Sequence, residues 1–494
     1  TEAEIGDILR VTGTVAEFTS SSSSQTQINA TAAVECDAAA SAVIAPTEVT
    51  LPFATADALE AVEGMLVTLP QELSIVEYFN YDRFGEVVLS SQRRINPTAL
   101  VDPGPAAVAL AEEYELDKIT LDDARSFQNP DPAIHPGNGQ EFTLDNRFRG
   151  GDTVTGVTGV IEETFGVYRL QPSTYGTYAA LNGRPAEAED VGGELTVASF
   201  NVLNYFTTLD DSGEICGPNG DERCRGADDA EELERQRAKI VDAIVRIDAD
   251  VVGLIEIEND LVDAAVADLV AALNAATAPG TYDYIATGAI GSDVIKVAFV
   301  YQPASVTPTG DFAVLDGSID VRFLDSKNRP ALAQTFTDSN GEIFTVTVNH
   351  FKSKGSPCDD VGDPNAGDGS GNCNGVRTDA AAALVDWLAT DPTGSGDPDQ
   401  LIIGDLNAYD KEAPIDAIIA GADDTDGTAD DYVDLVAAFQ GEEAYSYLFD
   451  GRLGYLDHAL ANDELAEQVT GTTEWLHTAD GPALLDYAPS FKQD

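Results

Sequence analysis

Six polar residues between positions 201 and 457 occupy similar positions, at or near the ends of apolar, strand-like segments. Asn201 ends LTVASFN, Glu256 lies late in VVGLIEI, His350 ends IFTVTVNH, Asp405 and Asn407 follow LIIG as GDLN, and Asp457 lies in GYLDHAL. One aspartate at a strand end is usually a cap or a turn residue, but several matching strand ends favour a shared site. The pattern therefore predicts that these residues converge at one edge of a layered α/β domain.

The side chains of this set suit metal-assisted chemistry at phosphorus. Carboxylate and amide oxygens are hard ligands that bind Mg²⁺, Mn²⁺ or Ca²⁺, and Asn201 with Glu256 could hold such an ion against a phosphate oxygen. The ion would stabilise the charge that develops in the transition state. His350 could hydrogen-bond or protonate a phosphate or leaving oxygen, while Asp405 and Asn407 could orient an attacking water.

The elements that must position these residues begin near Leu195, where strands and helices start to alternate. Leu233, Ile240 and Ile244 recur at helical spacing and predict a helix over Glu231–Ile247. A second helix is predicted over 377–389, between the strand-like segments that end in His350 and in LIIG. The pattern predicts an α/β domain over residues 193–494.

The front of the chain reads as β-rich. Strands are predicted within residues 1–100, and their number favours a small OB-like β-barrel, although a generic β-sandwich fits nearly as well. Residues 101–192 are predicted as a β-rich extension and linker that begins with a short helix near Ala106–Leu116. The segment GDTVTGVTGV at 151–160 echoes GDILRVTGTV at 6–15, and marks either a second β-element or a strand that completes the first barrel.

Four of the five cysteines lie in two close pairs. Cys216 and Cys224 bracket one short polar loop, and Cys358 and Cys373 bracket a loop rich in Asp and Gly. Neither pair has the CxxC spacing of a metal site, so two local disulfides are predicted, which implies an oxidising compartment. Cys36 is left over, either buried and free or paired outside the chain.

The charge of the chain is strongly negative. It carries 87 acidic and 26 basic residues, for a formal net charge of -61. This negative charge is the opposite of the basic surface expected of a nucleic-acid-binding protein. A strongly acidic surface favours solubility in a saline medium. If the substrate is a polyanion, local Arg and Lys clusters and bound divalent cations must overcome the repulsion. No apolar run approaches the ~18–20 residues that a membrane crossing requires.

Two further groups of residues leave alternatives open. The basic residues Arg93, Arg94, Arg147 and Arg149 and the aromatic residues Tyr78, Phe79, Tyr81 and Phe84 could form a surface that stacks bases and contacts phosphates. The aromatic residues could equally form barrel core. The acidic loops at 421–431 and between Cys358 and Cys373 could bind structural Ca²⁺, but a solvated acidic loop is the favoured interpretation.

The motifs also resemble a known family. SFNVLNYF, DADVVGLIEIEN, VNHFKSKG, IIGDLNAY and SYLFDGRLGYLDHAL resemble, in order and spacing, the endonuclease/exonuclease/phosphatase superfamily. Together with CGP…CRGADD, they are most similar to its secreted nuclease branch typified by ExeM and NucH. The resemblance covers roughly 195–490. It implies a DNase I-like four-layered α/β-sandwich, and it fits an OB-like domain ahead of it.

The resemblance also implies a role for each residue. It implies that Asn201 and Glu256 bind Mg²⁺ or Mn²⁺, and that His350 lies at the phosphate. It implies that Asp405 and Asn407 hold water and phosphate. It also implies that Asp457 orients a last histidine and that Arg329 lies near the substrate. The family supplies that histidine from a Ser-Asp-His motif, which does not occur in the printed sequence. His477 is a candidate stand-in. His458 should point to the opposite face of its strand from Asp457, so we expect it to pack.

The expected function is that of an extracellular, metal-dependent nuclease acting on DNA, with RNA as a further substrate. Within the same superfamily, a phosphatase or a lipid phosphodiesterase is the alternative enzyme. A binding protein that kept the fold and lost its activity is the alternative from a different class, favoured by the charge and by the absent Ser-Asp-His motif.

Overall fold

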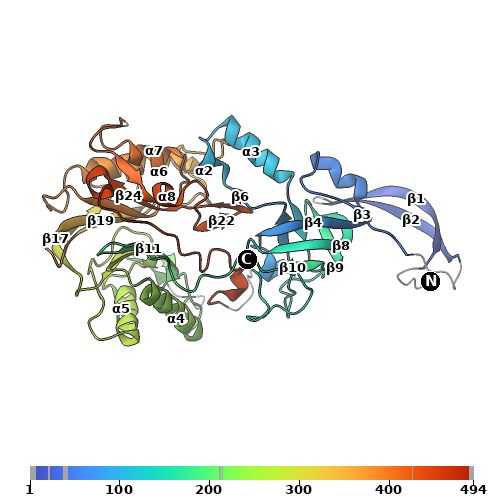
Figure 1. The fold of residues 1–494 in the computed structure, drawn as a ribbon, viewed down its shortest axis with the longest axis horizontal. Coiled ribbons are helices and arrows are strands. Elements are labelled where there is room, and N and C mark those ends of the chain that lie inside the picture. Colours follow the sequence, from blue (N-terminus) through green and yellow to red (C-terminus); the bar gives the residue numbers. More distant parts are fainter. Residues whose placement is uncertain are drawn as a thin grey trace.

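The computed structural model describes residues 7–20, 23–36, 43–210, 213, 215–425 and 427–488. A β-hairpin, a β-barrel and a layered α/β domain follow one another along the long axis of the molecule (Figure 1). Within the described ranges, no helix has the length and apolar character needed to cross a membrane.

Two β-sheets form the centre of the α/β domain. The four-stranded sheet has the order β11 (Val197–Tyr205), β14 (Val251–Glu258), β16 (Ile295–Tyr301) and β15 (Asp283–Tyr284). The six-stranded sheet has the order β17 (Val306–Leu315), β18 (Arg329–Asp338), β19 (Ile343–His350), β20 (Gln400–Asp405), β24 (Asp457–Asn462) and β21 (Tyr432–Asp434). The inner strands β14, β16 and β20 are mainly apolar because both faces of each sheet are covered.

Helices cover the outer faces of both sheets (Figure 1). α4 (Ala230–Ile247) and α5 (Ala264–Ala276) pack on the four-stranded sheet, and α6 (Asn374–Leu388) and α7 (Ala413–Ile419) pack on the six-stranded one. The short helices α8 (Leu435–Gln440) and α9 (Asp463–Ala466) adjoin β21 and β24. The predicted four-layered α/β-sandwich is therefore confirmed.

Three buried cores hold these four layers together. Between the sheets, Ile255 and Phe299 pack against Phe336 and Val346 from the facing sheet. The other two cores lie between each sheet and its helices. Burying one Leu, Ile, Val or Phe side chain stabilises a fold by about 1.5–3 kcal/mol, so these contacts fix the positions of the strand ends.

The barrel is built from five strands. Its order is β4 (Leu66–Glu77), β5 (Val87–Ser90), β7 (Ile119–Leu121), β9 (Val167–Thr174) and β8 (Thr153–Thr164), and β8 closes it by pairing with β4. β3 (Thr47–Glu48) and β10 (Thr177–Ala179) extend it. Two barrel strands precede residue 100 and three follow it, so the barrel spans the boundary predicted there. The strand that repeats the N-terminal pattern is β8, which completes the barrel, as the second alternative proposed.

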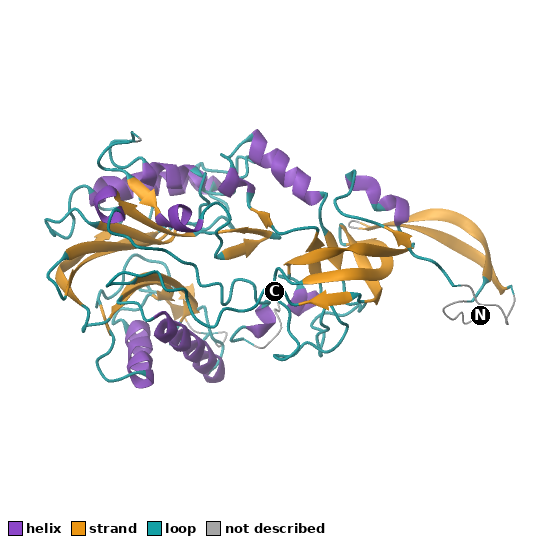
Figure 2. Cartoon of the chain, viewed as in Figure 1, coloured by secondary structure: helices purple, strands orange, loops and turns teal. Residues whose placement is uncertain are grey.

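The predicted N-terminal strands do not belong to this barrel. β1 (Leu9–Ser20) and β2 (Ser23–Glu35) pair with each other as a separate antiparallel hairpin that extends away from the barrel (Figure 2). The backbone N–H groups of Ser24 and Thr26 donate to Glu163 and Glu63 at the barrel. An alternating pattern indicates an extended segment, but it does not specify the strand with which that segment pairs.

The remaining elements are shorter, and some of them lie between the barrel and the α/β domain. They are α1 (Tyr81–Phe84), β6 (Arg94–Ile95), α2 (Pro97–Leu100), α3 (Pro105–Glu115), β12 (Ile215–Cys216), β13 (Glu222–Arg223), β22 (Tyr447–Phe449) and β23 (Arg452–Gly454), with 3-10 turns at Ala56–Ala58, Glu60–Val62, Asp359–Val361 and Ala483–Leu485. β6, which follows the first barrel strands, pairs with β23 of the α/β domain. The two domains therefore share a three-stranded sheet, β22-β23-β6.

Both predicted disulfides are present. Cys216 bonds to Cys224, and Cys358 bonds to Cys373. Cys36 is free and exposed, so the first of its two alternatives, a buried thiol, is wrong, and pairing outside the chain stays a prediction.

Candidate active site

Four of the predicted residues form one row across the six-stranded sheet. Arg329 of β18 lies opposite His350 of β19, His350 lies beside Asp405 of β20, and Asp405 lies opposite Asp457 of β24. Residues in register on neighbouring strands share a face and lie about 5 Å apart. We call Arg329, His350, Asp405 and Asp457 the polar row.

The two metal-ligand candidates, Asn201 and Glu256, come from the facing sheet, where the strands are irregular. The pairings of β14 with β11 and with β16 both shift register near Glu256, whose φ of 66° is left-handed. Asn201 Oδ1 accepts a hydrogen bond from Leu203 N at 2.9 Å, and Glu256 Oε2 accepts one from Asn204 N at 3.1 Å. Such a bulge redirects a side chain that a regular strand would aim into the helix-facing core.

A single cavity of about 1530 Å³ joins the two groups. Its lining includes Asn201, Glu256, His350, Asp405, Asn407 and Asp457. Arg329 is not part of the cavity lining but lies next to this set. Its guanidinium is 3.4 Å from His350 Nε2, and its Nε donates to Asp293 Oδ2 at 3.0 Å. The structure therefore places six predicted residues around one space and the seventh next to it.

His350 is buried among positive charges. Its Nε2 lies 3.4 Å from Arg329 Nη1 and 3.9 Å from Asp405 Oδ2. Because a guanidinium can only donate, a hydrogen bond between Arg329 and His350 requires Nε2 to be the acceptor. Burial, followed by the charge of Arg329, lowers the pKa of His350 well below its usual value, so the ring is neutral at pH 7.

The carboxylates of the cavity crowd one another. Burial, and then the charge of Asp457, raises the pKa of Asp405 well above its usual value. Burial raises the pKa of Asp457 to about 6, a rise that His458 opposes and Glu256 increases. Asn407 is held at a left-handed φ of 49°, and its N–H donates to Asp405 Oδ1 at 2.9 Å. Clustered carboxylate and amide oxygens without a matching charge fit a hard divalent cation.

A second acidic cluster lies beneath this site. Asp410, Asp434 and His458 present atoms within 4.8 Å of one another, a geometry that could bind a metal ion. His458 instead contacts Asp434 Oδ2 through Nδ1 at 3.1 Å and the Ala408 carbonyl through Nε2 at 2.8 Å. The hydrogen bond to Asp434 and its charge outweigh burial and raise the pKa of His458 to about 9. A protonated ring offers no lone pair to a metal, so His458 packs as an ion-pair partner, as predicted.

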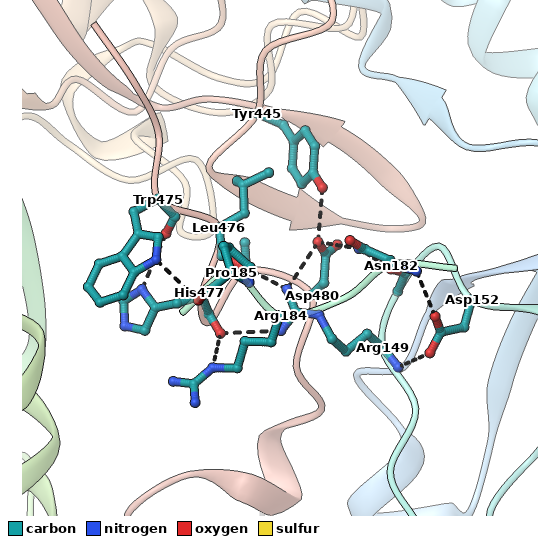
Figure 3. A network of polar contacts seen from close by, with 12 residues as sticks. Arg149, Asp152, Asn182, Arg184, Pro185, Tyr445, Trp475, Leu476, His477 and Asp480 are labelled. Atoms are coloured by element: carbon teal, nitrogen blue, oxygen red, sulfur yellow. Dashed lines mark hydrogen bonds and ion pairs between the residues drawn. The ribbon is translucent and has the colours of Figure 1, made fainter. Parts of the chain in front are cut away.

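Residues of the segment 468–481 line one side of the cavity. Polar contacts of Asp480 in this segment join it to the barrel (Figure 3). Asp480 forms an ion pair with Arg93 and accepts hydrogen bonds from Asn182 Nδ2 at 2.8 Å and Tyr445 Oη at 2.9 Å. Arg149 lies 3.5 Å from Asp480 and donates to the Leu476 carbonyl at 2.6 Å. Two of the predicted basic residues therefore hold the domains together.

His477 lies in this segment and lines the cavity. Its ring stacks on Trp475 at a centroid distance of 4.1 Å, and Nδ1 contacts the Trp475 carbonyl at 3.2 Å. Among the hydrogen bonds of the described residues, none joins His477 to Asp457. The contacts of His477 thus do not support the predicted stand-in role.

The remaining alternatives are decided by burial and by hydrogen bonding. Tyr78 and Tyr81 are barrel core, whereas Phe79 is exposed and lines the cavity. In the acidic loop 421–431, Asp430 accepts a hydrogen bond from Asp423 N, and Asp431 accepts one from Gly427 N. Hydrogen bonds within the loop thus occupy these carboxylates, as in a solvated acidic loop.

Sequence reasoning missed Glu474, another acidic residue of the cavity lining. Within the described part of the chain, its buried Oε1 has no hydrogen-bond partner. Burial, and then the charge of Asp457, raises its pKa to about 8. Glu474 follows no strand and belongs to no periodic pattern, so only the folded position of its loop reveals it.

A layered α/β sandwich with a histidine, amide side chains and crowded carboxylates in one cavity defines a phosphoester hydrolase of the DNase I-like type. Residues 198–480, more than half of the chain, match the Endonuclease/Exonuclease/phosphatase family. The chain belongs to this family, whose members hydrolyse phosphoesters and generally depend on a divalent metal.

Several solved structures resemble the chain. The human Nocturnin catalytic domain is 15% identical with a TM-score of 0.32, covering 47% of this chain and 75% of that one. A family protein from Bacteroides thetaiotaomicron is 17% identical with a TM-score of 0.34, covering 55% and 83%. A mannosyl-6-phosphatase from the same organism is 16% identical with a TM-score of 0.34, covering 55% and 86%. A search of the curated proteins finds no match.

Proposed function

We propose that this protein is an extracellular, metal-dependent nuclease that hydrolyses phosphodiester bonds of DNA, and RNA as a second substrate. The observation that carries the proposal is the shared cavity, which collects the six predicted residues from both sheets. The two disulfides favour an oxidising compartment, and the charge of -61 suits a saline medium. The motifs favour the ExeM/NucH-type branch.

Asn201 and Glu256 would hold the metal ion, Mg²⁺ or Mn²⁺. When bound, this ion would supply charge stabilisation at the phosphate oxygens. Asp405 and Asn407 lie on the opposite sheet, where they can orient a water. The raised pKa of Asp405 brings this carboxylate closer to neutral pH, where a general base is most effective. The neutral ring of His350 can donate its proton in a hydrogen bond to a phosphate or leaving oxygen.

A local cluster of cations supports a polyanionic substrate. Arg225 and Arg329 lie 3.7 Å and 3.0 Å from Asp293, and the charges of Arg329, Arg225 and Lys352 all act on His350. Burial, and then the charges of Arg329 and Lys327, lowers the pKa of Lys352. A concentration of positive charge beside the polar row is what a chain of net charge -61 needs to attract a phosphodiester backbone.

The barrel supports a nucleic-acid substrate as well. We propose that this barrel is OB-like, a proposal supported by its order β4-β5-β7-β9-β8, by its closure on β4 and by the parallel pairing of β7 with β9. Barrels of this kind bind single strands through basic and aromatic side chains. We propose that it holds substrate beside the active site, because its β4 ends at the cavity.

The test is cleavage of plasmid DNA by the purified chain with Mg²⁺, with Mn²⁺ and with EDTA, at low and high salt. His350→Ala and Asp405→Ala should each reduce cleavage by about 10²–10⁴-fold. Asp311→Asn, at an exposed position of β17 outside the cavity lining, is the matched control. Unchanged cleavage in either site variant would refute the assignment.

Two substrates separate the alternative functions. Faster hydrolysis of p-nitrophenyl phosphate than of bis(p-nitrophenyl) phosphate would favour a phosphatase. Binding of DNA without metal-dependent cleavage of any substrate would favour a binding protein.

A further inference from the structure

Three aromatic side chains are exposed in the cavity that His350, Asp405 and Asp457 line. Phe79 is 66% exposed, Tyr447 is 43% exposed and Phe449 is 61% exposed, and all three line this cavity. Aromatic side chains ordinarily contribute to stability by burial, so a group of exposed rings around a candidate active site calls for a ligand with an apolar face.

Two of the rings share one face of β22. Tyr447 and Phe449 lie two residues apart, with ring centroids 6.4 Å apart and an interplanar angle of 13°. Leu448, between them, packs against the barrel core. Alternation along the strand therefore anchors β22 through Leu448 and presents both rings on the opposite face.

The third ring is tied to this hairpin by Glu77. Glu77 Oε1 accepts hydrogen bonds from Tyr78 N and Phe79 N, both at 2.7 Å. Its Oε2 accepts one from Gly451 N at 3.0 Å, in the turn between β22 and β23. One carboxylate thus fixes the end of barrel strand β4 relative to the hairpin.

The pairing of β6 with β23 supports the same arrangement. It places Arg94 opposite Arg452 and Ile95 opposite Leu453, so the hairpin is held by hydrogen bonds as well as by Leu448. Tyr447 also lies near the reacting groups, since Asp405 and Glu77 are the charges that, after burial, raise its pKa. The backbone that carries the rings is therefore held in place before a ligand binds, which reduces the entropy lost on binding.

We propose that Phe79, Tyr447 and Phe449 form a stacking platform for unpaired nucleobases that flank the scissile phosphodiester. This inference rests on the proposed nuclease function and names its substrate class as single-stranded or locally unpaired nucleic acid. Stacking suits such a ligand because every base has a π-face, whereas the bases of an intact duplex stack on each other. The cations beside His350 would meet the phosphates, and the platform would meet the bases.

The test compares two substrates of equal length and charge, a single-stranded oligonucleotide and its abasic sugar–phosphate analogue. In the wild type, kcat/KM should be at least about 10-fold higher for the oligonucleotide, given the usual contribution of base stacking. Tyr447→Leu and Phe449→Leu keep an apolar side chain but remove the π-face, so this ratio should fall toward 1. Phe127→Leu, at an exposed ring outside the cavity (57%), is the matched control and should keep the ratio.

Binding in EDTA separates this inference from the nuclease proposal. Fluorescence anisotropy of both labelled substrates, measured without turnover, should show the same loss of preference in the Tyr447 and Phe449 variants. If the wild type binds with this preference but cleaves neither substrate, the nuclease function is refuted and the stacking platform is still supported. Equal affinity of the wild type for the two substrates would overturn the platform, as would equal losses of affinity for both substrates in the Tyr447 and Phe449 variants. Either result would favour a protein or lipid partner for the rings. Unchanged unfolding temperatures would show that the variants are folded.

Discussion

Two histidines of the same sheet differ in the charges that surround them. His350 lies beside Asp405, and His458 lies opposite Gly404, one residue earlier on the same strand. Their exposures are 3% and 1%, yet the pKa of His350 is lowered and that of His458 is raised to about 9. His458 bonds through both ring nitrogens, whereas the Nδ1 of His350 has no partner among the residues described.

The difference shows how burial can serve either stability or chemistry. Around His458, the charge of the ring is matched by Asp434, which lies 3.1 Å from Nδ1. Around His350, cations lie on one side and crowded carboxylates on the other, with a cavity between them. A buried polar group without an internal partner costs stability, and it persists where a ligand or a reaction uses it.

The largest expected effect comes from removing the unmatched carboxylate. Asp405→Asn should reduce kcat by about 10²–10⁴-fold, because it removes the water-orienting base. The folded-state pKa of Asp405 is raised, so its ionised form destabilises the fold at pH 7, and the variant should unfold at a higher temperature than the wild type. Steady-state cleavage and calorimetry check both changes. A less stable variant would contradict the proposed repulsion.

The opposite change is expected at the matched pair. Asp434→Asn leaves the buried charge of His458 without its partner, and breaking such a pair costs about 3–5 kcal/mol. The free energy of unfolding, measured with urea, should fall accordingly, while kcat of the folded fraction stays within about twofold because general acid–base groups are untouched. A large loss of kcat without a loss of stability would assign Asp434 to the reaction.

The pH dependence of stability should distinguish the two histidines further. The folded-state pKa of His458 is about 9, above its unfolded value, so its contribution is complete below about pH 6.5 and is lost as the pH rises through 9. Asp434 has a lowered pKa, and its contribution is lost in acid. Urea titrations at pH 6 and pH 9.5 give the free energy of unfolding at each pH. This free energy should fall more between the two pH values in the wild type than in His458→Gln. Parallel losses would exclude a charged His458 in the folded protein.

The smallest effect is expected from Arg329→Gln. Removing this cation should raise the pKa of His350 toward its usual value, although burial continues to lower it. The acid limb of the pH profile of kcat/KM should therefore move to higher pH, with a loss of about tenfold or less at pH 7 for one charged contact. Arg246→Gln, on the outer helix α4, is the control. An unmoved acid limb would show that His350 does not titrate in the reaction.

Local patterns allowed much of the candidate site to be predicted. Asp405 follows the apolar segment LIIG, and His350 ends a segment in which apolar residues alternate with threonine, so both segments could be recognised as strands. The two disulfides could be predicted because the cysteines of each pair are close in sequence. The position of Glu474 in the cavity could not be predicted, because its loop has no hydrophobic periodicity and does not follow a strand.

The sequence by itself determined which segments are strands and helices, and which polar residues stand at their ends, because these properties depend on neighbours a few residues apart. Only the tertiary structure decided the register that aligns Arg329 with Asp457, the barrel strands that cross residue 100, and the meeting of Phe79 with Phe449. Each of these depends on pairing between distant segments, and the burial and hydrogen bonding of the whole fold select that pairing.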